Sequence, residues 1–190
     1  DLVDAPTVEI RMPAESIMTL QSGPEIQLPR PEGISEVPPI VGLLRDEDER
    51  LLQAARRGNV VELERMLAAG QDPNVRGFGG WAPLHRAAFP GHVRMIEPLV
   101  KAGADINLPL HGVQDTDGDT ALHIAAAQGR LEMVKALIEA GAKELPNADG
   151  WTPLHRAALG SKTDVALYLM EQGFDAGAKA RDGWTPLHAA

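Results

Sequence analysis

Cysteine is absent from this chain of 190 residues, and aromatic residues make up only 4% of it. Without cysteine the chain can form neither a disulfide framework nor a thiolate metal site. Basic residues are also scarce, with 18 Lys and Arg against 27 Asp and Glu and a formal net charge of −9. This surplus of negative charge disfavours binding to nucleic-acid phosphates and to anionic membrane surfaces. We therefore expect no nucleic-acid partner.

Long hydrophobic runs and the common catalytic motifs are missing as well. No segment approaches the roughly eighteen apolar residues that span a bilayer, and no signal peptide opens the sequence, so we expect no membrane insertion and a cytoplasmic location. Because the chain begins with Asp1 rather than Met, an organellar or secreted location stays open. There is no phosphate-binding glycine loop, Gly-x-Ser-x-Gly elbow or zinc-binding His pair. We expect no enzyme activity, no cofactor, no metal and no small-molecule substrate.

Proline and acidic residues are concentrated at the start of the chain. Seven of the 15 prolines lie in the first 39 residues, and the first 50 residues hold 11 acidic and 4 basic residues. Proline removes a backbone donor and breaks helices. We interpret residues 1–46 as a proline-rich acidic arm, extended or disordered. Its segments 8–13 and 24–29 share the pattern Glu-Ile-x-apolar-Pro, which indicates either a short strand that lies in a groove or a chance similarity.

One nonapeptide recurs four times after the arm. It reads GWAPLHRAA at residues 80–88, GDTALHIAA at 118–126, GWTPLHRAA at 150–158 and, in shortened form, GWTPLHAA at 183–190. Successive copies are 38, 32 and 33 residues apart. A period of about 33 residues indicates structural repeats, which must stack because one unit cannot bury its apolar face alone.

Each repeat is predicted to hold two antiparallel helices. In the copy at 150–158, Thr152 suits the N-cap, Pro153 suits the first helical position, and the two alanines let a neighbouring helix approach closely. Apolar residues at helical spacing then predict a longer second helix. These second helices are expected over residues 60–67, 93–100, 131–138 and 163–170. Pro98 should distort the second of them, because it cannot donate a hydrogen bond to the carbonyl of Arg94.

The period, the Thr-Pro-Leu-His blocks, the paired alanines and GADIN at residues 103–107 closely resemble the ankyrin repeat family. The resemblance implies an all-α solenoid of stacked helix-turn-helix units with projecting hairpin loops, preceded by the arm. It covers residues 47–190. We divide these into an N-terminal unit at 47–79, full units at 80–117, 118–149 and 150–182, and a truncated unit at 183–190. Because the last unit stops after one short helix, we expect the natural chain to continue past Ala190.

The connection between the second and third units is five residues longer than the others, at residues 107–120. It is either a contact element or an insertion that an exposed loop tolerates. Its DTDGD run at 115–119 does not make a calcium loop, because the sixth and twelfth positions of an EF-hand would be Thr120 and Ala126. The family resemblance further implies that the block histidines bond to the adjoining loop backbone rather than to a metal. These are His85, His123, His155 and His188.

The resemblance also implies a concave groove, faced by the residue before each block, the residue after its histidine and the residues after the two alanines. All three tryptophans of the chain occupy the first of these positions. Trp and Arg often dominate binding interfaces. Alternatively, each Trp packs on a neighbouring loop and each Arg side chain extends into solvent without contacting a partner. The candidate partner-binding residues are Trp81, Arg86, Phe89, Asp119, Ile124, Gln128, Trp151, Arg156, Leu159 and Trp184.

We therefore expect a protein-interaction module that binds another protein or peptide segment in the groove and on the hairpin loops. Arg86 and Arg156 favour a partner with carboxylates or phosphate among apolar residues. The alternative is a regulatory or spacer domain of a larger protein, with its groove occupied by its own N-terminal arm.

Overall fold

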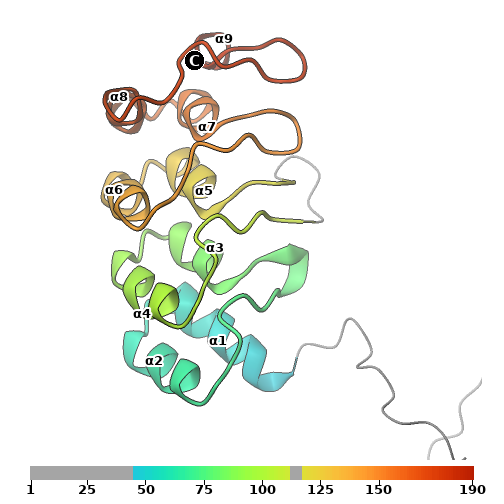
Figure 1. Cartoon of the computed structure of the whole chain (residues 1–190), viewed down its shortest axis with the longest axis vertical. Helices are drawn as coiled ribbons and strands as arrows, with labels where there is room; N and C mark the ends of the chain where they lie inside the picture. The colour runs from blue at the N-terminus through green and yellow to red at the C-terminus, as the bar shows by residue number, and fades with distance from the viewer. Residues whose placement is uncertain (1–44, 112–116) are drawn as a thin grey trace, which may run out of the picture. The chain divides into compact units, whose positions relative to one another are not determined.

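The computed structural model describes residues 45–111 and 117–190. The expected arm, apart from its last two residues, and residues 112–116 of the long connection therefore lie outside the described residues. Within the described ranges every regular element is a helix, and the helices form a stack in chain order (Figure 1). The all-α repeat architecture predicted from the sequence is confirmed. The bounds assigned to the arm and to each unit stay predictions.

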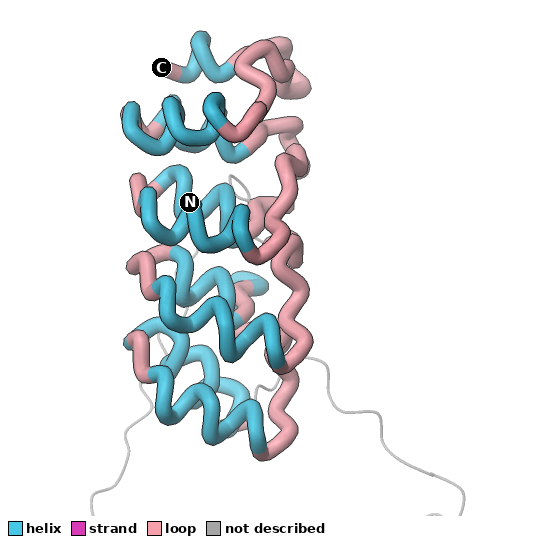
Figure 2. Tube along the Cα trace, turned by 60° about the vertical axis from the view of Figure 1, so that its left-hand side comes forward, coloured by secondary structure: helices cyan, strands magenta, loops and turns pink. Residues whose placement is uncertain are grey.

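The helices form two layers. The inner layer consists of α1 (Asp46–Arg57), α3 (Pro83–Ala88), α5 (Ala121–Ala127), α7 (Pro153–Leu159) and α9 (Pro186–Ala189). The outer layer consists of α2 (Val60–Ala68), α4 (Ile96–Lys101), α6 (Leu131–Glu139) and α8 (Thr163–Glu171). Each inner helix packs on the next one along the chain. The loops that join the units gather along one side of the stack (Figure 2).

The inner helices that follow α1 are each started by a block histidine. The backbone N–H of Thr152 donates to Nδ1 of His155 at 3.1 Å, and Pro153 takes the first helical position, where it needs no donor. Nε2 of His155 then donates to the carbonyl of Trp184 in the following loop at 3.2 Å. His123 makes the same pair of contacts, to Thr120 and to Trp151. The expected bonding to the backbone of the adjoining loop is confirmed for His85, His123 and His155.

Small residues of the inner helices and long aliphatic residues of the outer helices form the core. Ala87, Ala125 and Ala157 are completely buried, as are Leu137 and Leu169. Alanine lets neighbouring helices approach closely, whereas each leucine brings apolar area whose burial contributes about 1.5–3 kcal/mol. The core is therefore continuous along the stack rather than confined to single units.

The outer helix of the fourth unit differs from the sequence prediction, and that of the second unit agrees with it. In α8 the buried side chains are Val165 and Leu169, whereas Met170, which belongs to the apolar spacing that predicted a helix over 163–170, is 42% exposed. In the second unit the helix opens with a 3-10 turn, η2 (Val93–Met95), and continues as the short α4. This is the distortion expected from Pro98, which cannot close the helical hydrogen bond to residue 94.

Each loop folds back on itself as a hairpin just before an inner helix. Backbone bonds of 2.8–2.9 Å close the hairpins from Gly77 to Trp81, from Asn147 to Trp151 and from Ala180 to Trp184. The corresponding bond in the second loop runs from Leu110 to Asp119. The extra residues therefore fall between these two bonded residues in the chain, and the start of the next helix keeps its register.

Candidate functional site

The inner face is the surface formed by the inner helices and the hairpins that precede them. Two pockets lie on it, and each is built from a tryptophan before a block, an arginine after the block histidine and an apolar residue after the two alanines. We call them the N-terminal and C-terminal pockets. The N-terminal pocket is lined by Arg56, Trp81, Arg86 and Phe89. The C-terminal pocket is lined by Asp149, Trp151, Arg156, Leu159, Arg181 and Asp182.

In the N-terminal pocket, aromatic rings surround an arginine. The guanidinium of Arg86 lies 5.3 Å from the ring centroid of Trp81, and Phe89 meets the same ring edge-to-face at 6.1 Å. Arg86 also donates a long hydrogen bond of 3.5 Å to the carbonyl of Phe78, while its buried Nε has no partner among the residues that the structure describes. Burial lowers the pKa of Arg86, and Arg56 acts in the same direction. The pocket has a volume of about 220 Å³ and presents guanidinium donors beside an aromatic surface.

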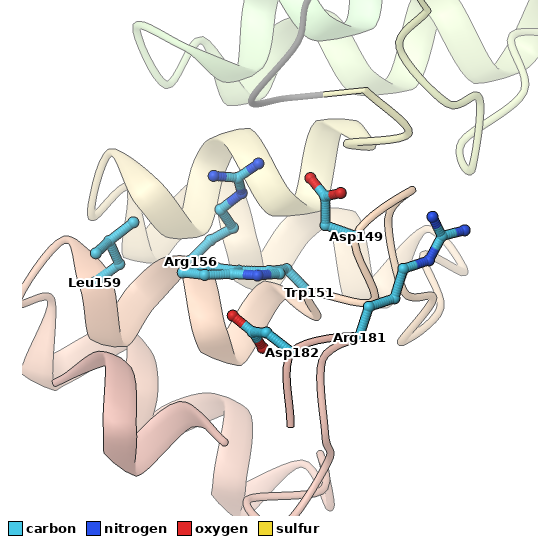
Figure 3. Close-up of a pocket in the computed structure, with 6 residues that line it drawn as sticks. All are labelled: Asp149, Trp151, Arg156, Leu159, Arg181 and Asp182. Atoms are coloured by element: carbon cyan, nitrogen blue, oxygen red, sulfur yellow. The ribbon is translucent and has the colours of Figure 1, made fainter. Parts of the chain in front are cut away.

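The C-terminal pocket has the same plan but a different charge arrangement (Figure 3). The guanidinium of Arg156 stacks over Trp151 at 5.5 Å and forms an ion pair with Asp119 of the preceding unit at 3.0 Å. Asn147 donates a further hydrogen bond of 2.8 Å to the same carboxylate. Burial raises the pKa of Asp119 to about 6, while Arg156 and Asn147 lower it. Asp119 therefore fixes the arginine over the ring of this pocket, which measures about 460 Å³.

Only some of the predicted contact residues are accessible. Phe89, Leu159 and Trp184 are 48%, 54% and 47% exposed. Trp81, Arg86, Gln128, Trp151 and Arg156 are partly buried. Asp119 and Ile124 are only 2% and 6% exposed, so we leave both out of the proposed contact set. In the third unit, Asp119 stands where the other units have Trp, and Ile124 stands where they have Arg. The aromatic surface is therefore divided into two pockets and does not form one groove.

The structure adds residues that the repeat pattern did not indicate. Phe78, within the 3-10 turn η1 (Phe78–Gly80), is 90% exposed beside the N-terminal pocket. Glycines on both sides of it permit this tight turn, since Gly79 has a φ of 70°. Asp149 and Asp182 line the C-terminal pocket from two successive hairpins. The sequence GFGG at residues 77–80 could have indicated that Phe78 is exposed, because an aromatic residue among glycines has little to pack against.

The described residues offer no metal site, since no group of three or more potential ligands occurs within residues 45–111 and 117–190. In those same ranges no helix has the length and apolar character needed to cross a membrane.

Comparison with known proteins agrees with the repeat geometry. The family model for the ankyrin repeat matches residues 79–109, and the model for ankyrin repeats in three copies matches residues 108–180 and 143–190. The chain belongs to the ankyrin repeat family. Ankyrin repeats are generally protein-interaction modules, which agrees with an inner face that carries pockets.

Several individual proteins are similar to this ankyrin repeat chain. The human Notch-regulated ankyrin repeat-containing protein is 49% identical over 129 residues, which cover 65% of this chain and 81% of the relative. The mouse oxysterol-binding protein-related protein 1 is 38% identical over 73 residues, or 33% of this chain and 8% of the relative. The bovine mitochondrial disaggregase is 42% identical over 62 residues, or 33% and 9%. The first similarity extends across most of a protein, and the other two are confined to short segments.

Proposed function

We propose that the inner face binds an extended segment of a partner protein, with the N-terminal and C-terminal pockets as its two anchor points. The observation that carries this proposal is the repeated construction of the pockets. In each, an arginine stacks on a tryptophan and a large apolar side chain, Phe89 or Leu159, stands about half exposed beside them. Aromatic and arginine side chains in partly desolvated pockets are the usual centres of binding energy.

The arginine stacking supports binding because it organises the pockets in advance. A stacked guanidinium loses little rotational freedom when a partner arrives, so less of the interaction energy is lost to ordering. In the C-terminal pocket the ion pair of Arg156 with Asp119 adds a second restraint.

We further propose that the protein acts as a non-enzymatic adaptor in the cytoplasm, with no cofactor and no small-molecule substrate. The similarity to a Notch-regulated protein over 81% of its length makes cells with active Notch signalling the first place to seek the partner.

Two leucines of the fourth unit provide a matched test. Leu159 lies on the inner face and is 54% exposed, whereas Leu167 lies in α8 of the outer layer and is 53% exposed. Proteins captured by the full chain should be lost, or bound at least about tenfold more weakly, with Trp151→Ala/Leu159→Ala. They should be retained with Leu167→Ala, and circular dichroism should show both variants helical. Retention by the first variant together with loss by the second would place binding on the outer layer instead.

A further inference from the structure

The two pockets share one construction but differ in charge, and we propose that they select different ends of the same partner segment. The N-terminal pocket takes an aspartate or glutamate side chain, and the C-terminal pocket takes a lysine or arginine side chain. This inference rests on the proposed function, since it assigns a chemistry to the same inner face.

The N-terminal pocket offers two guanidinium groups to a carboxylate. Its lining residues include Arg56 and Arg86 and no acidic side chain. Neither arginine forms an ion pair within the part of the chain that the structure describes. Glu49 is close enough to influence Arg86, but its carboxylate accepts a hydrogen bond of 2.7 Å from Gln53. A carboxylate from a partner would therefore supply charge-assisted hydrogen bonds that the pocket lacks.

Aromatic side chains define what surrounds that carboxylate. Phe78 is 90% exposed and Phe89 is 48% exposed, and both lie next to the Trp81–Arg86 stack. Exposed rings of this size are favourable contacts for aliphatic or aromatic side chains of a partner. The expected sequence at this end is thus an acidic residue with large apolar neighbours.

The C-terminal pocket has the opposite preference because its stacked arginine is already neutralised. Asp119 holds Arg156 with two contacts of 3.0–3.1 Å, so this guanidinium is engaged within the protein. Arg156 covers one face of the Trp151 ring, and Asp182 lies on the other side of it (Figure 3). Asp149 adds a second exposed carboxylate, against the single exposed cation of Arg181.

A cationic side chain would fit in the pocket beside the Trp151 ring, on the side of Asp182. The ring face attracts a cation through its quadrupole, and a neighbouring carboxylate adds a direct ion pair. The carboxylate is already oriented, because an oxygen of Asp182 accepts a hydrogen bond of 3.0 Å from the backbone N–H of Trp184.

The separation of the pockets sets the spacing within the partner. The N-terminal pocket lies on α1 and α3, and the C-terminal pocket lies on α7 and the hairpin before α9. Neighbouring helices pack about 8–10 Å apart, so two to three steps between the pockets amount to about 16–30 Å. An extended segment rises about 3.3 Å per residue. The acidic and basic residues should therefore stand about five to nine residues apart.

The test is selection of a displayed library of random 12-residue peptides on the full chain, followed by affinity measurements with the peptides obtained. We expect the selected peptides to carry an acidic and a basic residue at the spacing given above. Replacing the acidic residue of a peptide by its amide should lower its affinity at least about fivefold for the wild-type chain. The same replacement should have no effect on the variant Arg56→Gln/Arg86→Gln, because the groups that recognise the charge are then gone.

The basic residue is tested in the same way with Asp149→Asn/Asp182→Asn. Asparagine keeps the acceptor that orients the hairpin before α9, so this variant removes charge with little change in structure. Its affinity should be insensitive to replacement of the basic residue by glutamine, while it remains sensitive to replacement of the acidic one. Circular dichroism of both variants checks that they fold.

The outcomes separate this inference from the proposed function. Peptides that bind, lose binding with Trp151→Ala/Leu159→Ala and show no charge preference would overturn the inference and leave the inner face as the binding surface. Charge preferences that persist unchanged in the two amide variants would also overturn it. Failure to select any peptide, or selection of peptides indifferent to Trp151→Ala/Leu159→Ala, would contradict the proposed function as well.

Discussion

The ion pair between Asp119 and Arg156 should be one of the strongest single contributions to stability at the inner face. It joins the hairpin before α5 to α7 of the next unit, and its two side chains are only 3% and 12% exposed. Removing one partner of a buried pair leaves an uncompensated charge, which typically costs about 3–5 kcal/mol. We expect Asp119→Ala to cost about 3 kcal/mol, at the low end of this range, because Arg156 borders a pocket and can turn toward water.

Arg156→Ala should show a pH dependence that Asp119→Ala lacks. In this variant the carboxylate of Asp119 stays buried without its cation, so the pKa of Asp119, already raised to about 6 by burial, should rise further. The loss of stability should therefore be larger at pH 7.5 than at pH 5, where a proton neutralises the group. In the double variant neither charge is left alone, so its cost should fall below the sum of the single costs by about 1.5 kcal/mol or more.

Urea unfolding followed by tryptophan fluorescence and by circular dichroism measures all three variants. Lys101→Ala is the matched control, since it breaks the exposed pair with Glu97 in the outer layer and should leave the midpoint unchanged. Additive costs within about 0.5 kcal/mol, or single variants that unfold at the wild-type midpoint, would refute the reasoning.

Three further outcomes follow from the same structure. Burial lowers the pKa of His85 and of His123 to about 4 from 6.5, so their contribution to stability is present above pH 6.5 and is lost as the pH falls toward 4. Asp119 contributes in the opposite direction, because burial raises its pKa to about 6. Urea unfolding at pH 5 should therefore show a net loss of about 2 kcal/mol of stability relative to pH 7, and a gain would contradict this assignment. Gly118→Ala should destabilise more than Gly103→Ala in the same assay, because both have positive φ but only the added Cβ at 118 would stand 2.7 Å from a backbone nitrogen. Adding a chelator should leave the melting temperature unchanged, since both ring nitrogens of His85, His123 and His155 already have protein partners; a fall would point to a metal.

The fold could be predicted from the sequence because its signals are local and repeated. The regular spacing of the Thr-Pro-Leu-His blocks predicts a stack of repeats. The pair Thr152 and Pro153 predicts the start of a helix, and so does the same pair where it recurs at 185–186. The face of α8 was harder, since Val165 and Met170 are both apolar and only packing against α7 and α6 decides which is buried.

The site was predictable in its positions but not in its chemistry. The repeat pattern placed Trp81 and Trp151 correctly on the inner face, yet it could not show that Asp119 lies within reach of Arg156, 37 residues along the chain. That contact changes Arg156 from an anion-binding group into an internally paired one. Phe78 was missed because it lies in a hairpin outside the repeated block.

The base of the long hairpin is closed by two hydrogen bonds of 2.8 Å, one from Leu110 to the carbonyl of Asp119 and one from Gly118 to the carbonyl of Leu110. This closure makes the number of residues between Leu110 and Gly118 independent of the spacing of the helices. Closing a longer connection costs little, about 0.6 kcal/mol for each doubling. A foreign peptide, a fluorescent label or an affinity tag can therefore be inserted between these two residues while the stack on either side keeps its register.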